Sequence, residues 1–312
     1  MRARDPQFSP DGKWLVASAL REIRAWPLEG QDNGAGRTLV DDLEDWGAFI
    51  AFHPSGESLA YSDFLGDVVA VVPLDEGPRR VMPGKARGVP ACSPDGRLLA
   101  VPSYLSLSSR WQTEDPNEEL FIRVWDLESD RVEDLGPVPS RGTAFLAFDD
   151  DRRLRWVGPG NDELSGGEWV FDLDDGTVEV VAEEVEEWGR WVSSDGEFML
   201  VYEQRGLFWK SSQGGEPRLI TSHGEGDIAI DPSNQWMASG DSDGLVRVGP
   251  VTGEEPHLLY GHEGGTWGLA ISPDGRWIAS AGDDGTVRLW PMPDMSEPPL
   301  HALPHDELIT KL

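Results

Sequence analysis

The sequence predicts an all-β fold of the β-propeller class, with seven blades of four antiparallel strands each. A tight-turn motif recurs at intervals of roughly 40 residues along the 312-residue chain, and short apolar strands flank each turn. The chain also holds 14 tryptophans, which indicates that a repeated structural element uses this residue. Four short strands in each such interval are typical of propeller blades. Helical periodicity is absent before the last dozen residues.

The recurring turn has the form Ser-Pro-Asp-Gly or a close variant. Proline presets φ at the second position, aspartate caps its neighbours, and glycine or asparagine accepts a positive φ at the end. The final positions of the seven turns are Gly12, Gly56, Gly96, Arg152, Gly196, Asn234 and Gly275, which lie 44, 40, 56, 44, 38 and 41 residues apart. Arg152 breaks the preference for a residue with positive φ, so the fourth turn departs furthest from the pattern.

The strands around these turns follow one order in every repeat. A first apolar strand precedes the turn, as at 49–52, and a second follows it, as at 98–101. The third strand ends in a bulky anchor in six repeats: Trp26, Val72, Trp125, Phe171, Trp209 and Trp290. The sixth repeat has Gly249 at this place and must fill the gap differently. A fourth strand is expected at 37–40, 79–82, 131–135, 178–182, 218–221, 257–260 and 300–303.

These repeats predict one propeller domain over residues 1–303 and a short C-terminal tail over 304–312. The expected blades are 1–42, 43–84, 85–137, 138–183, 184–222, 223–261 and 262–303. Because all seven units run in the same strand order, no spare strand is left to close the ring. Either side-chain packing between blades one and seven closes it, or upstream sequence is missing.

The seventh repeat carries a family resemblance. It contains Gly261-His262, the turn Ser272–Gly275 and the run Ala279–Trp290, and the third repeat adds the pair Trp125-Asp126. In these features the chain resembles the WD40-repeat family over essentially its whole length, most strongly in repeats one, three, six and seven. The tail after Pro304 resembles the segment that follows the propeller in bacterial proteins that couple a serine/threonine kinase to WD repeats. No kinase motif is present here.

The resemblance also assigns a role to a set of polar residues that could be mistaken for a hydrolase triad. It implies that His262, Ser280, Asp284 and Trp290 form a buried hydrogen-bonded tetrad, which fixes one blade conformation when every member is satisfied. Repeat six keeps His223, Ser239 and Asp243 but lacks the tryptophan. No nucleophile elbow, phosphate loop, paired-carboxylate motif or Cys/His metal spacing occurs. The sequence therefore predicts no catalytic residue, no metal and no cofactor.

Tryptophans beside carboxylates form the candidate binding site. By the resemblance, loops between blades gather on one face, called the top, which commonly binds peptides and proteins. The residues expected there are Trp46, Trp111, Trp188, Trp267, Glu44, Asp45, Glu186 and Glu187. An indole face attracts Lys and Arg side chains, and carboxylates steer them from a distance. The alternative is that these tryptophans pack against neighbouring blades and that the acidic runs are simply solvated.

The charge and cysteine content narrow the partners and the compartment. The net charge of −31 repels phosphate backbones and anionic lipid, so nucleic acid and membrane surfaces are poor partners. Cys92 is the single cysteine, which excludes an intrachain disulfide. No apolar signal region and no 18-residue apolar run occurs. We expect an acidic, cytoplasmic, bacterial protein that is a monomer.

The predicted function is that of a non-catalytic scaffold that binds a protein or peptide through an acidic, tryptophan-rich top face suited to basic segments. Two alternatives remain open at this point. One is a propeller enzyme similar to lactonases or hydrolases, with a metal in the central channel, although the inner strands offer mainly glycine, alanine and apolar residues. The other is an extracytoplasmic propeller similar to TolB, against which the run Asp283–Trp290 argues.

Overall fold

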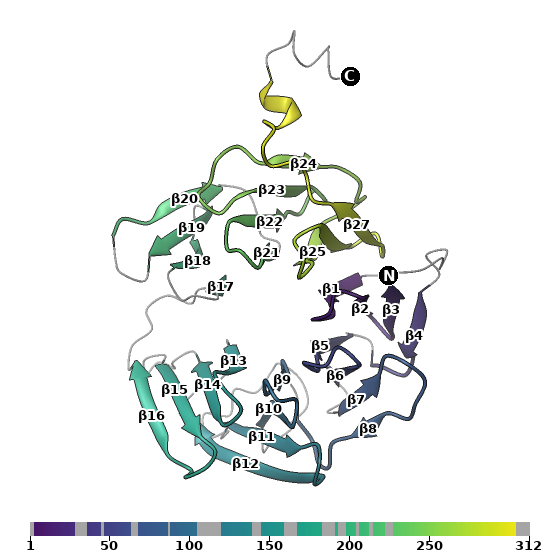
Figure 1. Cartoon of the computed structure of the whole chain (residues 1–312), viewed down its shortest axis with the longest axis vertical. Coiled ribbons are helices and arrows are strands. Elements are labelled where there is room, and N and C mark those ends of the chain that lie inside the picture. Colours follow the sequence, from purple (N-terminus) through teal and green to yellow (C-terminus); the bar gives the residue numbers. More distant parts are fainter. Residues whose placement is uncertain are drawn as a thin grey trace. The chain divides into compact units, whose positions relative to one another are not determined.

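Antiparallel β-sheets make up nearly all of the described structure. A computed structural model describes residues 3–28, 36–44, 47–63, 68–86, 88–104, 120–138, 145–158, 167–182, 191–192, 198–203, 206–211, 215–221 and 227–303. Within these ranges 27 strands form seven sheets, six with four strands and one with three (Figure 1). The all-β class and the seven propeller blades predicted from the sequence are confirmed. None of the described helices is long and apolar enough to cross a membrane.

The sheets follow one another along the chain, and we number them as blades one to seven. Blade one has the order β1-β2-β3-β4, formed by Ala3–Phe8, Trp14–Ala19, Ile23–Pro27 and Arg37–Val40. Two compact units divide the chain, and we describe them separately. The middle unit comprises Leu20–Ile23 and Thr38–Trp188, and the terminal unit comprises Met1–Ala19, Arg24–Arg37 and Gly189–Leu312.

The middle unit contains blades two, three and four. Blade two is formed by β5 Ala48–Phe52, β6 Ser58–Asp63, β7 Val69–Pro73 and β8 Arg80–Val81. Blade three is formed by β9 Ala91–Cys92, β10 Leu98–Tyr104, β11 Leu120–Asp126 and β12 Arg131–Val138. Blade four is formed by β13 Phe145–Phe148, β14 Arg153–Gly158, β15 Gly167–Asp172 and β16 Val178–Ala182.

The terminal unit contains blades five, six and seven. Blade five is formed by β17 Trp191–Val192, β18 Phe198–Glu203, β19 Gly206–Ser211 and β20 Arg218–Thr221. Blade six is formed by β21 Ile228–Ile230, β22 Trp236–Gly240, β23 Val246–Pro250 and β24 His257–Leu259. Blade seven is formed by β25 Thr266–Ile271, β26 Trp277–Gly282 and β27 Val287–Pro291.

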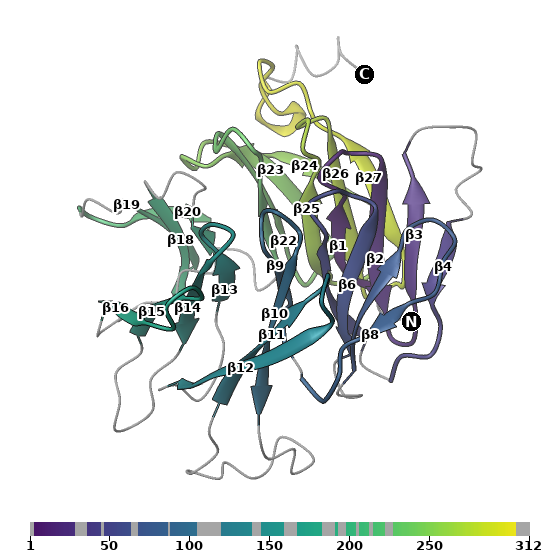
Figure 2. The same cartoon turned by 60° about the horizontal axis from the view of Figure 1, so that its bottom comes forward.

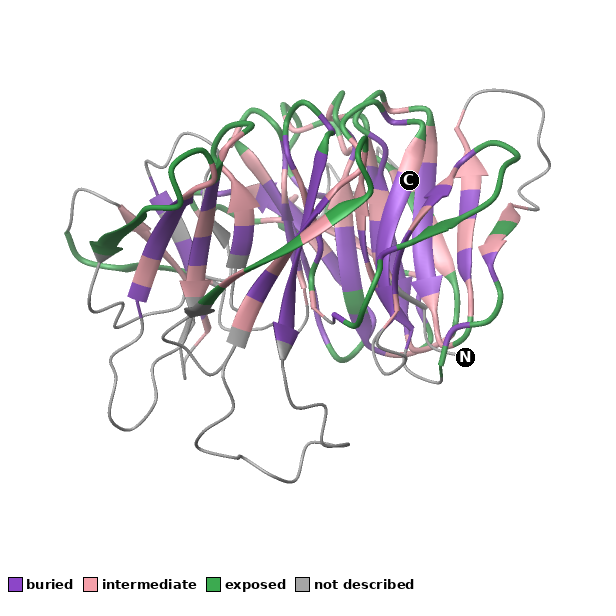
Figure 3. Ribbon diagram, turned by 90° about the horizontal axis from the view of Figure 1, so that it is seen from below, coloured by how far each residue is buried: buried purple, intermediate pink, exposed green. Residues whose placement is uncertain are grey.

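Burial within the sheets falls from the second strand to the fourth (Figure 3). In β22 and β26 every residue after the initial tryptophan is buried. In β16, by contrast, Val178, Val180 and Val181 are each about half exposed. The second strand has sheets packed against both of its faces, so both of its alternating sets of side chains are apolar or small.

The hydrophobic core consists of separate clusters, each lying between two consecutive blades. In the middle unit Trp125 is buried between blades two and three, and Trp156 between blades three and four. In the terminal unit Met237 belongs to the cluster between blades five and six, and Ile278 to the cluster between blades six and seven. Each blade is thus stabilised by its neighbours, as in other repeat architectures.

Blades one and seven pack together within the terminal unit. Phe8 and Leu15 of blade one share a cluster with Ala279 of blade seven, and β1 lies beside β25 and β26 (Figures 1 and 2). The approach is close at Gly268, where an added Cβ would lie 2.5 Å from Cδ of Pro6 and 2.9 Å from the backbone nitrogen of Asp5. Packing between blades one and seven, which one of the two sequence-based alternatives requires, is therefore observed.

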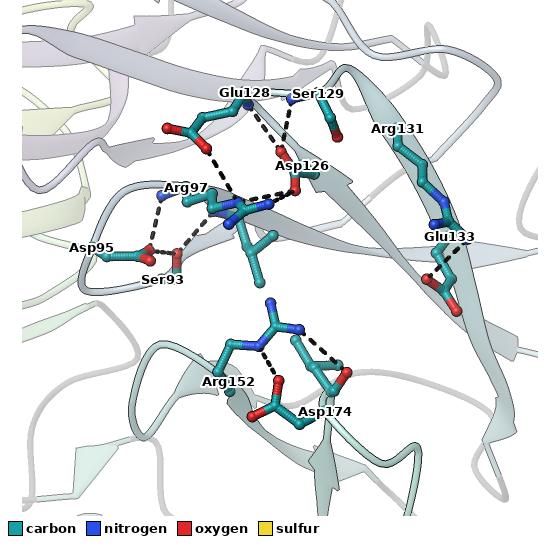
Figure 4. Close-up of polar contacts among 12 residues, drawn as sticks. Ser93, Asp95, Arg97, Asp126, Glu128, Ser129, Arg131, Glu133, Arg152 and Asp174 are labelled. Atoms are coloured by element: carbon teal, nitrogen blue, oxygen red, sulfur yellow. Dashed lines mark hydrogen bonds and ion pairs between the residues drawn. The ribbon is translucent and has the colours of Figure 1, made fainter.

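The Ser-Pro-Asp-Gly turns satisfy their own backbone groups. In blade three the Ser93 hydroxyl donates to Oδ1 of Asp95 at 2.6 Å and accepts from the backbone nitrogen of Leu98 at 2.9 Å (Figure 4). Asp95 accepts from the nitrogen of Arg97, and Gly96 takes a φ of 75°. The same pattern recurs in the turns of blades one and seven. These contacts account for the serine, aspartate and glycine of the motif.

The fourth turn differs from the others, as predicted. Arg152, which occupies the glycine position, is not among the described residues with positive φ. Its guanidinium donates to Oδ1 of Asp174 at 2.8 Å (Figure 4). Asp150 accepts from the backbone nitrogens of Arg152 and Arg153. An aspartate-capped turn of another type therefore replaces the glycine turn here.

Neighbouring turns of the middle unit are joined by hydrogen bonds. Nε2 of His53, in the turn of blade two, donates to the carbonyl oxygen of Gly96 in the turn of blade three at 2.8 Å. The backbone nitrogen of Asp95 donates to Oδ1 of Asp151 in the turn of blade four at 2.8 Å. His53 is half-buried in this position. Its ring therefore bridges the turns of blades two and three.

The predicted outer strand at 300–303 is also wrong. Leu300–Ala302 form a 3₁₀ helix, and the sheet of blade seven ends at β27 among the described residues. Pro298 and Pro299 precede this segment. Proline has no N–H to donate to a strand ladder, so this stretch cannot pair along β27 as the outer strands of the other blades pair with their neighbours.

Replacing Gly268 by alanine tests the contact between blades one and seven. We expect Gly268→Ala to lower the free energy of unfolding by about 1–3 kcal/mol, because the new methyl group overlaps Pro6 and the Asp5 backbone. Gly275→Ala is the control, since its Cβ meets nothing within 4 Å and its φ of 69° alone costs about 1 kcal/mol. Urea denaturation measures both, and an equal or smaller loss at Gly268 would contradict the packing.

Candidate functional site

Four polar side chains of blade seven form one hydrogen-bonded chain. Nε1 of Trp290 donates to Oγ of Ser280 at 2.8 Å, and this hydroxyl lies 2.7 Å from Nε2 of His262. Nδ1 of His262 lies 3.0 Å from Oδ2 of Asp284. Ser280 and the His262 side chain are fully buried. The structure thus brings together all four residues of the predicted blade-seven tetrad.

The chemistry of these atoms fixes the direction of each hydrogen bond. The carboxylate of Asp284 can only accept, so Nδ1 of His262 carries a proton and donates to it. In the neutral imidazole, Nε2 then accepts a hydrogen bond from the hydroxyl of Ser280. The oxygen of this hydroxyl in turn accepts a hydrogen bond from Nε1 of Trp290. Every buried polar atom of the tetrad therefore has a partner. The serine hydroxyl is engaged on both sides, which is a structural arrangement and not that of an activated nucleophile.

Asp284 anchors the tetrad to the loop that enters blade seven. Burial acts to raise the pKa of its carboxyl, but hydrogen bonds outweigh burial and hold the pKa below its usual range. The donors are the backbone nitrogens of Thr286 and Glu263, the Thr286 hydroxyl and His262. At neutral pH this carboxylate therefore ties the turn after β26 to the segment around His262.

The same loop exposes two side chains suited to a partner. Two hydrogen bonds hold residues 261–267. The backbone nitrogen of Glu263 donates to Oδ2 of Asp284, and the backbone nitrogen of Asp283 donates to the Gly265 carbonyl oxygen at 2.9 Å. Between these contacts the Glu263 side chain is exposed, and Trp267 at the start of β25 is 40% exposed. The buried tetrad thus holds the backbone of a surface loop that exposes one carboxylate and one indole. We call residues 261–267 the blade-seven loop.

Of the other residues predicted to form the binding site on the top face, only Glu44 lies within the described ranges. Glu44 is exposed, and its backbone nitrogen donates to Oδ2 of Asp63 at 3.1 Å. The remaining predicted residues lie outside the described ranges: Asp45, Trp46, Trp111, Glu186, Glu187 and Trp188. A binding site that includes Trp46, Trp111 and Trp188 therefore stays a prediction, and Trp267 and Glu44 are its described members.

The acidic run before Trp46 has a structural use as well. Asp42 receives both terminal nitrogens of Arg79, at 2.7 and 2.8 Å, and Arg79 also donates to the hydroxyl of Tyr61 at 3.0 Å. The bidentate contact holds the pKa of Asp42 below its usual range. Arg79 is thereby fixed between the entry to blade two and its second strand. Asp42 is thus engaged in an ion pair with Arg79, and Glu44 is not part of that ion pair.

Blade six uses a different acid from the one predicted. Ser239 is buried and Asp243 is exposed, while His223 lies outside the described residues. The buried acid of this turn is Asp241, which accepts from the nitrogens of Asp243 and Leu245 and from Nη1 of Arg247 at 2.5 Å.

The reason is visible at the matching position of blade seven, which is Gly282. A Cβ there would lie 2.6 Å from Nδ1 of His262, so the full tetrad needs glycine at this place. Asp241 occupies that place in blade six, and sequence reasoning missed it. The aspartate in place of the glycine, followed by Arg247 on the next strand, is the signal that could have revealed the pair.

Within the described ranges, no three His, Cys, Asp or Glu side chains are grouped closely enough to hold a metal ion. Burial raises the pKa of the Cys92 thiol to about 12, so this thiol stays protonated at neutral pH. Cys92 packs, partly buried, against the cluster between blades two and three.

A family comparison matches part of the chain. The model described as WD domain, G-beta repeat (WD40) matches residues 217–248 and 253–291. These stretches run from β20 into β23 and from the segment before β24 to the end of β27. The two stretches are similar to WD40 repeats. With the seven sheets, the match assigns the fold to the seven-bladed WD40-type β-propeller. No curated protein matches the chain. Similarity to kinase-coupled bacterial WD-repeat proteins stays a prediction.

Removing the central hydroxyl of the WD40 tetrad tests its contribution to stability. Ser280→Ala leaves Nε2 of His262 and Nε1 of Trp290 without their partner, and each buried group left unsatisfied costs about 1–3 kcal/mol. We expect a loss of at least about 2 kcal/mol in urea denaturation. Ser242→Ala, at an exposed serine in the blade-six turn, should change stability by less than about 0.5 kcal/mol. A loss at Ser280 no larger than this would refute the assignment.

The lowered pKa of Asp284 predicts a pH dependence with a defined sign. A carboxyl whose pKa is lower in the folded than in the unfolded state stabilises the fold above its unfolded pKa of about 4. This stabilisation disappears as the pH falls through the folded pKa. Relative to the native chain, Asp284→Asn should therefore lose about 1–3 kcal/mol at pH 5–7, and the difference should shrink steadily below pH 4.

The exposed acid of the same loop provides the control for this series. Glu263→Gln should follow the native chain within about 0.5 kcal/mol over the whole pH range, because its side chain is exposed. Chemical denaturation at each pH measures both differences. A gap between Asp284→Asn and the native chain that stays constant down to pH 2.5 would contradict the role given to Asp284.

Proposed function

We propose that this WD40-type propeller is a non-catalytic scaffold that binds a protein or peptide partner, with a preference for basic segments. The observation that carries the proposal is the blade-seven loop. Its buried His262 is held by Asp284 and Ser280. The side chains of Glu263 and Trp267 on the same loop are exposed and are not part of the tetrad. An exposed indole and an exposed carboxylate on one loop suit Lys or Arg, which can stack on the ring and pair with the acid.

The net charge supports the same class of partner. With 57 acidic and 26 basic residues the chain attracts cationic segments from a distance and raises their rate of association. The same charge disfavours nucleic acid and anionic membranes. Exposed tryptophans are frequent centres of binding energy, because a large rigid surface is buried at a small entropic cost.

The chemistry of the tetrad supports a non-catalytic role. Its serine, histidine and aspartate have the composition of a hydrolase triad, but Ser280 is fully buried and accepts the indole N–H of Trp290. A substrate carbonyl has no access to a hydroxyl in that position. The set instead keeps the blade-seven loop in one conformation, which lowers the entropic cost of binding a partner.

A peptide-binding measurement tests the proposal. The probe is a fluorescein-labelled nonapeptide rich in Arg and Lys, and the control peptide carries Glu in place of the basic residues. Fluorescence polarisation with the full chain should show binding of the basic peptide alone, weakening as salt rises. Trp267→Ala should weaken binding about tenfold, a typical effect for a central tryptophan. Glu263→Gln should reduce it by a smaller factor.

The matched control is Leu289→Ala. Leu289 lies on β27 of the same blade and is 39% exposed, close to the exposure of Trp267. Its replacement should leave the affinity unchanged. Binding that survives Trp267→Ala in full, or that Leu289→Ala weakens equally, would show that the chain attracts the peptide through net charge alone and would reject the proposed site.

A further inference from the structure

Blade six contains a pocket at the place where blade seven holds the tetrad tryptophan. Met237 and Ser239 on β22, Gly249 on β23, and Pro256 and Leu258 around β24 line it. It has a volume of about 280 Å³. An apolar cavity of roughly 150 Å³ is sufficient to bind benzene, so this one has room for a two-ring aromatic group.

The strand registers show that the two positions are equivalent. In blade seven Trp290 pairs with Ile278, and in blade six Gly249 pairs with Met237. The serines match in the same way, since Ser280 pairs with Arg288 and Ser239 with Arg247. Gly249 therefore stands where blade seven has its indole. The other five blades carry Trp26, Val72, Trp125, Phe171 and Trp209 at the end of the third strand.

Blade seven shows what such a pocket accommodates. There the indole of Trp290 packs against Gly261, where an added Cβ would lie 2.7 Å from the ring, and its Nε1 donates to the buried Ser280 hydroxyl. Blade six keeps the buried serine, Ser239, on the wall of its pocket. Gly249 has no side chain that could fill the space or donate to that hydroxyl. The third-strand anchor is missing, but the serine to which it would donate is retained.

The mouth of the pocket carries charges that are already paired with one another. The exposed Glu255 accepts from Nε2 of His301 at 2.8 Å, and the 3₁₀ helix with His301 lies beside β24 (Figure 1). Glu254 lies 3.8 Å from Arg218, and Arg247 is bound to Asp241. Because each of these groups already has a polar or charged partner, the pocket favours a neutral ligand with apolar faces and one N–H donor over a simple cation.

We propose that the blade-six pocket is a binding site for an indole ring supplied from outside the chain. The ring occupies the space left by Gly249, lies against Met237 and Leu258, and donates its N–H to Oγ of Ser239. The source is either a small indole compound or a tryptophan side chain of a partner protein. The site lies on a different blade from the blade-seven loop, so it does not depend on the function proposed above.

Fluorine NMR of 5-fluoroindole added to the full chain tests the proposal, since the 14 native tryptophans obscure fluorescence. We expect saturable binding, with dissociation constants in the high micromolar to millimolar range typical of fragments. Competition by unlabelled indole should be about threefold to tenfold stronger than by 1-methylindole, which lacks the N–H donor. Competition by N-acetyl-tryptophanamide identifies a peptide tryptophan as a source, whereas competition by indole alone identifies a small molecule.

Two variants locate the binding site. Ser239→Ala should abolish the preference for indole over 1-methylindole, while Ser242→Ala at an exposed serine of the same blade should keep it. Gly249→Trp should block 5-fluoroindole by supplying an internal ring, after a small shift of Pro256, which would lie 3.1 Å from the new Cβ. Thermal denaturation checks that each variant is folded. Absence of saturable binding, an unchanged preference in Ser239→Ala, or full binding by a folded Gly249→Trp would each overturn the proposal.

Discussion

Within each of the two units, the structure depends on the packing of small sheets against their neighbours. A sheet of three or four short strands has two apolar faces and cannot form a stable core of its own. Second strands such as β22 and β26 are buried along nearly their whole length because side chains from adjacent blades cover both faces. The clusters around Trp125, Trp156 and Ile278 each contain residues of two consecutive blades. The stability of any one blade is therefore a property of the blade together with the blades beside it.

Short polar side chains make this arrangement compatible with a buried backbone. The turn serines and aspartates accept backbone N–H groups at the ends of the first and second strands, and the tetrad of blade seven does the same for the loop that enters it. Several of these carboxyls have lowered pKa values for this reason, among them Asp274, whose pKa of about 2 is due first to its hydrogen bond with Ser272. Part of the strong acidity of the chain is thus structural, and the remainder is available for steering a partner.

Much of the fold could be predicted from the sequence, because the turns repeat and leave little freedom between them. The outer strands at 37–40, 178–182 and 218–221 were predicted with the bounds that the structure has. The failures have physical causes. Pro298 and Pro299 prevent an outer strand in blade seven, which a count of strands per repeat cannot detect. The bridge from His53 to Gly96 spans two blades, and sequence spacing carries no information about such contacts.

The candidate site was predictable to a smaller extent. The tetrad around His262 follows from a nearly complete repeat, whereas Asp241 was missed because it takes a position where the pattern expects glycine. The sequence predicted a gap at Gly249 but not the pocket itself. The lining of the pocket includes residues from blade five, from the segment around Pro256 and from the 3₁₀ helix, and no local sequence pattern connects these segments. Binding surfaces assembled from distant segments need the three-dimensional arrangement of those segments.

The stretches matched by the WD40 model and the sheets of the structure begin and end at different places along the chain. The stretch 253–291 carries the outer strand of blade six together with the three strands of blade seven. A gene that grows by copying such a unit adds each new sheet already joined by continuous peptide to the one before it. Deletion of the stretch 253–291 would remove the outer strand of blade six together with the three strands of blade seven. The unit that is repeated in the sequence therefore differs by one strand from the sheet that forms in the structure.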